Sequence, residues 1–311
     1  MSMKEASFHH IPVLFQESID SLNIQPDGIY VDCTSGGGGH SSAIAKQLKG
    51  GRLISIDRDP QAIEILKERL LPFGCVTLVH DNFFNIKNIL ASLGISGVDG
   101  ILADLGVSSH QLDEPSRGFS FHHDAPLDMR MSLEGMSAAQ AVNTLSQDEL
   151  RKIIFEYGEE KFAPSIAKAI VRERAIKPIE TTVELAEIIK SAMPAAARRD
   201  GHPARRTFQA IRIYVNGELD GLGNAVEDMF DCLNKGGRLS VITFHSLEDR
   251  TIKREFAEFA KGCTCPKNFP VCVCGNTPRA KVIKAVAPGK NELSDNNRSR
   301  SARLRTAEKL V

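Results

Sequence analysis

Several things are missing from this sequence, and each absence excludes a class of protein. The 311 residues contain no tryptophan, no internal repeat and no low-complexity tract, and no apolar run approaches the length of a membrane span. The first ten residues, M-S-M-K-E-A-S-F-H-H, lack the apolar stretch of a secretory signal. We therefore expect a globular protein of the cytoplasm without membrane contact.

An excess of one charge is also missing. Lys plus Arg and Asp plus Glu both number 39, so the net charge does not indicate a polyanionic partner. Seven cysteines is an odd number, and in a reducing compartment they are expected to be thiols or metal ligands. The chain is long enough for one large or two modest domains.

The first hundred residues alternate between strand and helix patterns. Short apolar strands are predicted at 28–33, 52–57, 76–81 and 98–105. Helices are predicted between them, and Asp59 and Pro60 suit the N-cap and first position of one helix. This alternation predicts an α/β fold with a doubly wound, parallel sheet.

An aspartate stands at or near the end of each predicted strand. These residues are Asp32, Asp57, Asp81 and Asp104. The carboxyl ends of parallel strands lie at one edge of a sheet, and ligands of doubly wound sheets bind there. The four acids therefore predict a ligand site along that edge.

The first strand leads into a loop with four consecutive glycines, in V-D-C-T-S-G-G-G-G-H at 31–40. Glycine this dense predicts a backbone that must turn sharply or approach a ligand closely. A phosphate-binding loop would need a lysine after the glycines, and none follows. A dinucleotide fingerprint would need glycine where Ser41 or Ser42 stands. Neither kind of nucleotide loop fits.

A different cofactor fits the spacing of this loop. Asp32, Thr34, Gly36 and Gly38 come close to the D/E-x-G-x-G-x-G pattern of methyltransferases that use S-adenosylmethionine (SAM). SAM has no pyrophosphate, so its loop needs close backbone approach instead of a phosphate cradle. Asp57, 19 residues after Gly38, is suited to accept hydrogen bonds from both ribose hydroxyls. A plain glycine-rich turn and a nicotinamide cofactor are the alternatives.

Asp104 indicates the type of reaction. In enzymes that methylate amino groups, this position carries Asp or Asn. An exocyclic base amine is a poor nucleophile, and a carboxylate that accepts its N–H bonds favours the pyramidal nitrogen that attacks the methyl group. Methylation at C5 of cytosine would need a cysteine nucleophile, usually presented as Pro-Cys, and this dipeptide is absent. A helix-capping role for Asp104 is the structural alternative.

After residue 113 the pattern changes to helices. Apolar spacing near 3.6 residues predicts several helices within 137–195 and one more at 206–219. A fifth strand, 236–244, then returns the chain to the sheet. We therefore predict a discontinuous SAM-binding domain, formed by 1–112 and 213–311. The inserted helical domain, 113–212, is predicted to recognise the substrate.

Basic residues concentrate in two segments. Residues 194–212 contain five arginines and one acid, and residues 276–311 contain nine Lys or Arg and three acids. Arginine suits phosphate contacts, so the segments predict nucleic-acid binding, with a solvated face or a tail as the alternative. The candidate substrate-binding residues are Arg205, Arg206, Arg212, His245 and Arg250. In F-H-S-L-E-D-R, after the fifth strand, the individual roles of His245, Glu248, Asp249 and Arg250 stay open.

Four of the cysteines form a cluster in the sequence. They are Cys263, Cys265, Cys272 and Cys274. Four thiolates can bind zinc tetrahedrally, although C-x-C pairs are less diagnostic than C-x-x-C pairs. A compact loop of free thiols is the alternative. The remaining cysteines are interpreted as small core residues, namely Cys33, Cys75 and Cys232.

The order of these motifs resembles one family. The blocks include V-D-C-T-S-G-G-G-G-H-S, D-G-I-L-A-D-L-G-V-S-S-H-Q-L-D, Y-G-E-E-K-F-A, R-T-F-Q-A-I-R-I-Y-V-N-G-E-L and F-H-S-L-E-D-R. Together they resemble the ribosomal RNA small subunit methyltransferase H family, also called the MraW family, over almost the whole chain. The resemblance implies a class I (Rossmann-like) methyltransferase fold with a helical insertion. It also implies SAM-dependent methylation of the N4 amine of a cytosine in the decoding region of 16S rRNA, in bacterial cytoplasm.

Motif by motif, the resemblance also implies site residues. The SAM contacts fall on Gly38, Gly39, His40, Asp57, Phe83, Asp104 and Gln111, and Asp104 is the catalytic residue. The implied partner is 16S rRNA in the small ribosomal subunit, and a homodimer is left open. Ser35 and Gly37 depart from the family pattern, since relatives often carry another residue at the first and G-R-G-G-H around the second. Neither change removes a needed side chain, and the family does not decide whether the cysteines bind metal.

Two other functions are the rivals of this interpretation. One is an amino methyltransferase that acts on DNA, on another RNA or on a small molecule. The other is a non-catalytic ribosome-binding relative that keeps the fold without turnover. Labelled methyl transfer to small subunits and to DNA separates the first rival, and calorimetry of SAM binding with an Asp104→Ala variant tests the second.

Overall fold

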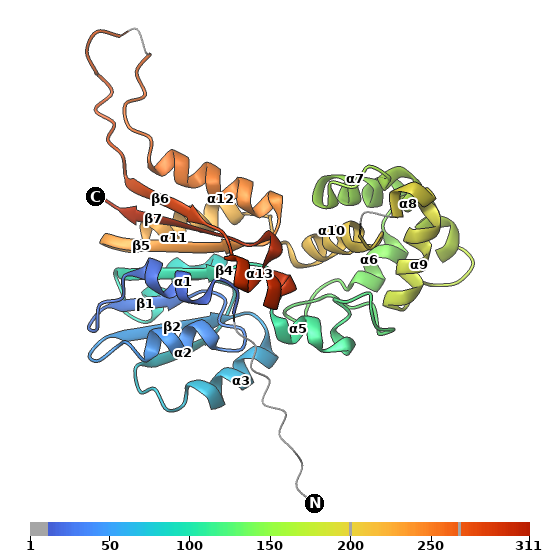
Figure 1. Ribbon diagram of the computed structural model, residues 1–311, viewed down its shortest axis with the longest axis horizontal. Helices are drawn as coiled ribbons and strands as arrows, with labels where there is room; N and C mark the ends of the chain where they lie inside the picture. Colours follow the sequence, from blue (N-terminus) through green and yellow to red (C-terminus); the bar gives the residue numbers. More distant parts are fainter. Residues whose placement is uncertain (1–11, 199–200, 267–268) are drawn as a thin grey trace, which may run out of the picture. The chain divides into compact units, whose positions relative to one another are not determined.

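A computed structural model describes residues 12–198, 201–266 and 269–311 of the chain (Figure 1). Contacts within the chain divide it into two compact units. Unit 1 consists of Met1–Gly106 and Gly221–Val311, and unit 2 of Val107–Asp220. No helix in the described ranges is both long and apolar enough to cross a membrane.

Unit 1 contains a seven-stranded sheet in the order β3-β2-β1-β4-β5-β7-β6. The strands are β1 (Ile29–Asp32), β2 (Arg52–Asp57), β3 (Val76–His80), β4 (Val98–Asp104), β5 (Leu233–Thr243), β6 (Ala280–Val286) and β7 (Arg303–Lys309). Strands β1 to β5 are parallel, and β7 runs antiparallel to both β5 and β6. The predicted α/β, doubly wound sheet is confirmed, and the first four predicted strands agree with β1 to β4 to within one residue at each end.

The last two strands correct the interpretation of the basic segment 276–311. This segment is not a tail, because its strand β7 pairs with β5. The pairing extends from Arg303 opposite Thr243 to Glu308 opposite Arg238. Leu304, Thr306 and Ala307 of β7 are buried in the sheet, while its basic residues are exposed or half-buried. The high basic content had obscured this strand pattern.

Helices pack on the sheet of unit 1 in two groups. Helix α1 (Phe15–Leu22) contacts α2 (Gly39–Ala45), which contacts α3 (Pro60–Leu70), and α11 (Leu222–Asp231) contacts both α4 (Ile86–Ser92) and α12 (Ser246–Phe259). The short helix α13 (Lys290–Asp295) precedes β7. Helix α3 begins as predicted, since the Asp59 carboxylate accepts the Gln61 N–H at 3.0 Å and Pro60 needs no donor at the first position.

The strands at the centre of the sheet are buried on both faces. Val31, Ile54 and Ile101 are fully buried on the neighbouring strands β1, β2 and β4. Continuous burial of this kind is typical of a parallel sheet covered by helices. It holds the carboxyl ends of these strands in fixed register.

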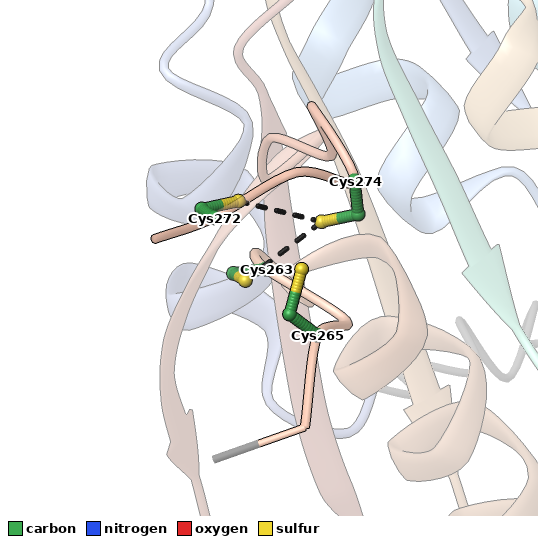
Figure 2. A group of neighbouring side chains, drawn as sticks. All are labelled: Cys263, Cys265, Cys272 and Cys274. Atoms are coloured by element: carbon green, nitrogen blue, oxygen red, sulfur yellow. Dashed lines mark hydrogen bonds between the residues drawn. The ribbon is translucent and has the colours of Figure 1, made fainter. Parts of the chain in front are cut away.

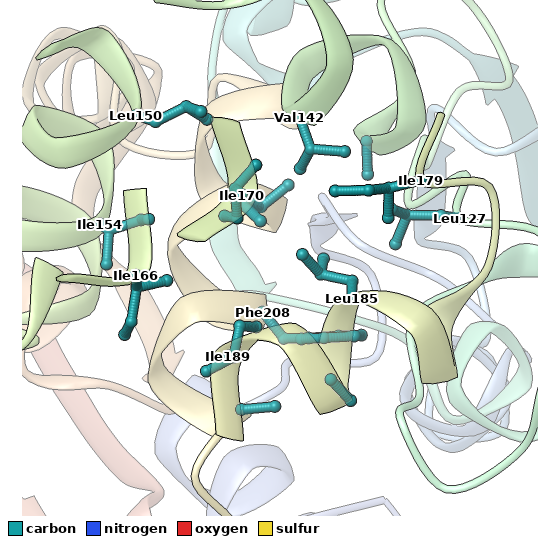
Figure 3. Close-up of a cluster of buried hydrophobic side chains, with 14 of the residues drawn as sticks. Leu127, Val142, Leu150, Ile154, Ile166, Ile170, Ile179, Leu185, Ile189 and Phe208 are labelled. Atoms are coloured by element: carbon teal, nitrogen blue, oxygen red, sulfur yellow. The ribbon is translucent and has the colours of Figure 1, made fainter. Parts of the chain in front are cut away.

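Unit 2 is helical and has its own hydrophobic core. Its helices are α5 (Ser109–Asp113), α6 (Ala138–Thr144), α7 (Gln147–Gly158), α8 (Ala163–Arg174), α9 (Thr182–Ala192) and α10 (Arg205–Asn216). Figure 3 shows side chains from α6 to α10 meeting in this core, among them Leu150, Ile166, Ile170, Leu185 and Phe208. Helices form in the predicted helical block, 113–212, but unit 2 is wider than this block and extends from Val107 to Asp220.

The ends of these helices follow from local sequence. Ser137, Ser146 and Thr181 each begin a helix with a capping box, in which the residue three positions later returns the hydrogen bond. Helix α10 ends at Asn216, earlier than the predicted 219, because Gly217 turns into the left-handed region at φ 57°.

Candidate functional site

Three acidic residues end neighbouring strands at one edge of the sheet of unit 1. Asp32 ends β1, Asp57 ends β2 and Asp104 ends β4, while Asp81 follows β3 directly. In the parallel register Asp32 pairs with Ser55, and Asp104 pairs with Ile242 of β5. We call Asp32, Asp57, Asp81 and Asp104 the carboxylate edge.

The glycine loop adapts its backbone to this edge. Gly36 lies at φ 49°, and its N–H donates to Asp57 Oδ2 at 2.7 Å. Gly38 lies at φ 78° and begins α2, where a Cβ would come within 2.9 Å of Leu66 Cδ2. At Gly39 a Cβ would meet Pro12 Cγ at 2.5 Å. These three positions need glycine, for its left-handed conformation or for close packing.

Gly37 is different from its neighbours. A Cβ there would have Arg69 Nη1 as its nearest atom, at 3.9 Å, and the residue has no positive φ. Its carbonyl accepts a hydrogen bond from Arg69 Nη1 at 2.6 Å, which any residue could provide. The structure thus gives no reason for glycine at this position, where relatives were expected to carry a side chain.

The loop after β3 lies beside Asp57. The Asp81 N–H donates to the Asp57 carbonyl at 3.1 Å, and Phe83 follows two residues later, half-buried and edge-on to Phe84 with ring centroids 4.9 Å apart. The Asp57 carboxylate also accepts the Asp59 N–H at 2.8 Å, while burial raises its pKa. The structure therefore brings two of the predicted SAM contacts, Asp57 and Phe83, to one place.

Asp32 is fully buried under the glycine loop. Its carboxylate accepts the Ser41 hydroxyl at 2.6 Å and the Thr34 N–H at 3.2 Å. Burial raises the pKa of Asp32 to about 6, against the effect of these hydrogen bonds. The Ser41 hydroxyl also lies 2.8 Å from that of Ser55. In the sequence, Ser41 served only to rule out a dinucleotide fingerprint, which needs glycine there. Its contact with Asp32 was not predicted.

His40 and Asp104 face each other at the end of β4. His40 Nδ1 lies 3.8 Å from Asp104 Oδ2, and the His40 ring stacks on Phe15 with centroids 5.6 Å apart. Asp104 is tied to the glycine loop, because its N–H donates to Thr34 Oγ1 at 2.6 Å. The structure thus places His40 next to Asp104, while its predicted contact with the cofactor stays a prediction.

Two polar atoms of this pair lack partners. His40 Nε2 and Asp104 Oδ1 are buried, and neither has a hydrogen-bond partner among the residues that the structure describes. Buried polar atoms are rarely left this way, so they mark a place for a ligand or water. The Asp104 side chain is 23% exposed, whereas that of His40 is 5% exposed, so Asp104 is the one within reach of solvent.

Burial controls the charges of this pair. It lowers the pKa of His40 to about 4, so the ring is neutral near pH 7. It also raises the pKa of Asp104 well above the ordinary value, assisted by the negative charges of Asp32 and Glu248. The edge therefore concentrates acidic groups that gain from a positive charge placed among them.

The segment after β5 is mainly structural in the contacts that the structure gives it. His245 is the N-cap of α12, and Glu248 Oε2 accepts the Phe244 N–H at 2.9 Å. Asp249 binds Arg305 of β7 at 2.7 and 2.9 Å. Arg250 is exposed on α12. Helix capping and anchoring of β7 thus account for part of what the sequence left open.

The other predicted residues lie in unit 2. Gln111 closes the capping box of α5 with Ser108. Arg205 and Arg206 are exposed in the first turn of α10, whereas Arg212 forms a two-pronged ion pair with Glu218 at 2.8 Å for each bond. Two further residues of the basic segment, 199 and 200, lie outside the described residues.

Part of the second basic segment is engaged within unit 1. Arg279 Nη1 and Nη2 bind Glu227 and Asp231, each at 2.6 Å. Lys309 Nζ donates to the carbonyls of Asp231 and Leu233 at 2.8 and 2.7 Å. In the same segment Lys281, Lys284 and Arg303 are exposed, so the prediction of phosphate contacts stays open for these residues.

The cysteine cluster gathers between α12 and β6, away from the regular elements (Figure 2). The sulfurs of Cys263, Cys265, Cys272 and Cys274 all lie within 4.8 Å of one another. Backbone N–H groups of Asn276 and Thr264 lower the pKa of Cys274 to about 5. Outside the cluster, Cys33 is buried as predicted, and Cys75 and Cys232 are half-buried.

Comparison with known proteins gives full-length matches. A family model described as the MraW methylase family matches residues 7–310. A ribosomal RNA small subunit methyltransferase H of Clostridium botulinum (strain Kyoto) is 58% identical over 97% of this chain and 99% of its own. The proteins of the same description from Brevibacillus brevis and Symbiobacterium thermophilum are 57% and 54% identical, over 99% and 98% of this chain and 100% and 98% of theirs.

Proposed function

The chain belongs to the MraW methylase family, and we propose that it methylates the N4 amine of a cytosine in the decoding region of 16S rRNA. Methyl transfer from SAM is the activity of this family, and the α/β fold with its helical unit is of the class I methyltransferase kind. RNA as the substrate follows from relatives named for small-subunit ribosomal RNA. Asp104 at the end of β4 supports an amine as the acceptor.

The residues at the carboxylate edge fit the proposed cofactor. When bound, SAM supplies a methyl group activated by a positively charged sulfur. Gly38 and Gly39 would give the close backbone approach, Asp57 would accept the ribose hydroxyls, and the Phe83 ring would pack on an apolar face. The unpartnered atoms of His40 and Asp104 are the observation that carries this fit, because a polar ligand would satisfy them.

Asp104 has the geometry for the role of amine acceptor. Its carboxylate stands on a rigid strand, held by the Thr34 hydroxyl through its own N–H, with one oxygen unpartnered. In this role it accepts an N–H bond of the exocyclic amine and orients the nitrogen lone pair toward the methyl group. Neutral His40 beside it offers a hydrogen bond without adding a repelling positive charge.

Unit 2 would recognise the RNA. Arg205 and Arg206 stand exposed at the first turn of α10, where their side chains suit phosphate contacts. Arg212, held by Glu218, is the least suited of the three arginines to such a role. We also propose that Gln111, which shares unit 2, contributes to cofactor binding, and that the enzyme acts on the small subunit in bacterial cytoplasm.

The test combines chemistry on the RNA with a deletion strain. Labelled methyl from SAM should pass to isolated small subunits and not to naked DNA, and mass spectrometry of 16S rRNA should lose one N4-methylcytosine signal in the deletion strain. Arg205→Gln with Arg206→Gln should raise the KM for small subunits without changing SAM affinity. Transfer to DNA alone would contradict the proposed substrate, and SAM binding without any transfer would favour the non-catalytic alternative.

A further inference from the structure

The segment between α12 and β6 has no hydrophobic core of its own. Residues 260–279 contain no helix or strand in their described part, and their apolar side chains point to solvent. Val271 and Val273 are 69% and 73% exposed, and Phe269 is 51% exposed. Figure 1 shows the segment running away from the sheet before β6 returns. Burial therefore cannot specify its conformation.

The base of this segment is nevertheless closed. The Arg279 N–H donates to the Phe259 carbonyl at 2.8 Å, and Asn276 Nδ2 donates to the Gly262 carbonyl at 2.7 Å. The Arg279 guanidinium also lies over the Phe259 ring at 5.4 Å. The two ends of the segment are thus held together, and the four cysteines lie beyond this closure.

The sulfurs converge with the spacing of a metal site. Cys274 Sγ lies 3.5 Å from Cys272 Sγ and 3.7 Å from Cys263 Sγ, and no pair among the four exceeds 4.8 Å. Four thiolates around one zinc, with Zn–S bonds of about 2.3 Å, lie about 3.8 Å apart. Figure 2 shows the four side chains pointing toward a common centre.

Backbone amides point at the same sulfurs. The N–H groups of Thr264 and Asn276 donate to Cys274 Sγ at 3.3 and 3.5 Å, and the N–H of Val273 donates to Cys265 Sγ at 3.4 Å. Such donors surround the thiolates of metal sites and stabilise their negative charge. Because the segment is exposed and has no core, packing does not fix these sulfurs. A bound ion would hold them in the positions where they accept the N–H bonds.

The C-x-C spacing explains how a short segment can supply four ligands. Residues two apart on an extended chain point to the same side, so Cys263 with Cys265, and Cys272 with Cys274, each form a two-sulfur claw. The sulfur set excludes hard cations such as Mg²⁺ and Ca²⁺, which prefer oxygen. The closed tetrahedral arrangement leaves no position for a substrate.

We propose that Cys263, Cys265, Cys272 and Cys274 bind one structural zinc ion, which replaces the missing core of the segment 260–279. Binding exchanges the thiol protons of the cysteines for the metal, and its free energy orders the segment. The site shares no residue with the carboxylate edge. The zinc proposal can therefore be tested independently of the proposed methylation.

Metal analysis of the full-length chain, purified without chelators, tests this site. One zinc per chain is expected by elemental analysis, and Cys272→Ser with Cys274→Ser should lower it to less than a tenth. The matched control is Cys75→Ser, a half-buried thiol outside the cluster, which should keep one zinc. Zinc-depleted chain refilled with Co²⁺ should show the visible bands of a tetrahedral tetrathiolate site.

A measurement on the unmodified chain removes any dependence on how the variants fold. A thiol reagent should leave the four cysteines of the cluster unmodified until a strong chelator is added, and amide exchange in 260–279 should then accelerate while the β4 and β5 amides stay protected. A metal-free chain with no cobalt spectrum, iron in place of zinc, or disulfides among the four cysteines in unreduced peptides would overturn the proposal.

Discussion

The carboxylate edge and the cysteine cluster are two groups of four acidic side chains that the chain assembles in opposite ways. Asp32 and Asp57 stand at the ends of buried parallel strands, so the sheet fixes them before any ligand arrives. The cysteines stand in an exposed segment, where little besides the sulfurs themselves and a few backbone bonds hold them together. The fold alone positions the carboxylate edge, whereas the proposed zinc ion would order the cysteine cluster.

The difference also shows in how each group bears its charge. At the carboxylate edge, burial raises the pKa values of Asp32, Asp57 and Asp104, so the fold holds its acids at a cost that a cationic ligand would offset. In the cluster, backbone N–H bonds lower the pKa of Cys274 without burial. In the same cluster, contacts with the other three thiols raise the pKa of Cys263 to about 11, so negative charge is not favoured at every sulfur.

The largest effect is expected from replacing Asp104, the proposed catalytic residue of the carboxylate edge. Asp104→Asn keeps the shape but removes the strong acceptor, so the rate of methyl transfer should fall by about 10²–10³. The melting temperature should not fall, because a buried charge is removed. Single-turnover transfer and calorimetric melting measure the two quantities.

The control lies at the other end of the same strand. Asp99 accepts the Ile29 N–H at 2.8 Å and a hydrogen bond from Asn234 at 2.9 Å, so Asp99→Asn should lower the melting temperature and leave the transfer rate within about twofold. Full activity of Asp104→Asn would show that the edge is only a binding site.

Smaller losses of stability and SAM affinity are expected from a substitution in the glycine loop. They measure how much of the site depends on the loop backbone. Gly38→Ala places a Cβ at a residue with φ 78° and within 2.9 Å of Leu66, so stability should drop by about 1–3 kcal/mol. SAM affinity should weaken about tenfold, which is about 1.4 kcal/mol. Urea unfolding and calorimetric titration give both values.

The neighbouring glycine provides the matched comparison. Gly37→Ala meets open space apart from Arg69 at 3.9 Å, so its stability should stay within about 0.5 kcal/mol of the unchanged chain or rise slightly. Equal losses for the two variants would mean that the loop tolerates no side chain for a reason other than backbone conformation.

The smallest effect is a pH dependence that tests the stored charge directly. SAM carries a positive sulfur, whereas S-adenosylhomocysteine does not. Asp32, with a raised pKa of about 6, gains its charge as the pH rises from 5 to 7, so attraction for the cation is present above this window and lost below it. The ratio of the two affinities should rise roughly fivefold toward pH 7, or about 1 kcal/mol.

A control variant separates Asp32 from Asp57 and Asp104, whose pKa values burial also raises. His40 has a pKa lowered to about 4 and stays neutral throughout the window, so it adds no competing charge. Asp32→Asn should flatten the ratio, while both ligands still bind. A ratio that falls with rising pH would show that the acids of the edge do not face the sulfur.

Much of the fold and of the site was accessible from the sequence, since both rest on local patterns. Apolar runs ending in Asp predicted the positions of the first four strands along the chain and the carboxylate edge, and Asp59 with Pro60 predicted a helix start. What was missed depends on long-range pairing. The ion pair between Arg212 and Glu218 needs the turn at Gly217, and the Ser41 contact with Asp32 needs the loop to fold back.

The strands β6 and β7 were missed although a signal was present. In R-L-R-T, the first half of β7, apolar or small residues alternate with charged ones, which is the pattern of a strand with one solvated face. The count of basic residues drew attention to partners instead. The basic content of a segment does not show which of its side chains face solvent, whereas the spacing of its apolar residues does.

Strand β7 also determines what an incomplete chain would be like. It lies between β5 and β6, so a product ending before Arg303 would leave unpaired edges on both of them. Open strand edges template intermolecular pairing, and Arg305 would no longer neutralise Asp249. Premature termination in this region should therefore yield aggregates for cellular proteases to clear, instead of a weakened enzyme.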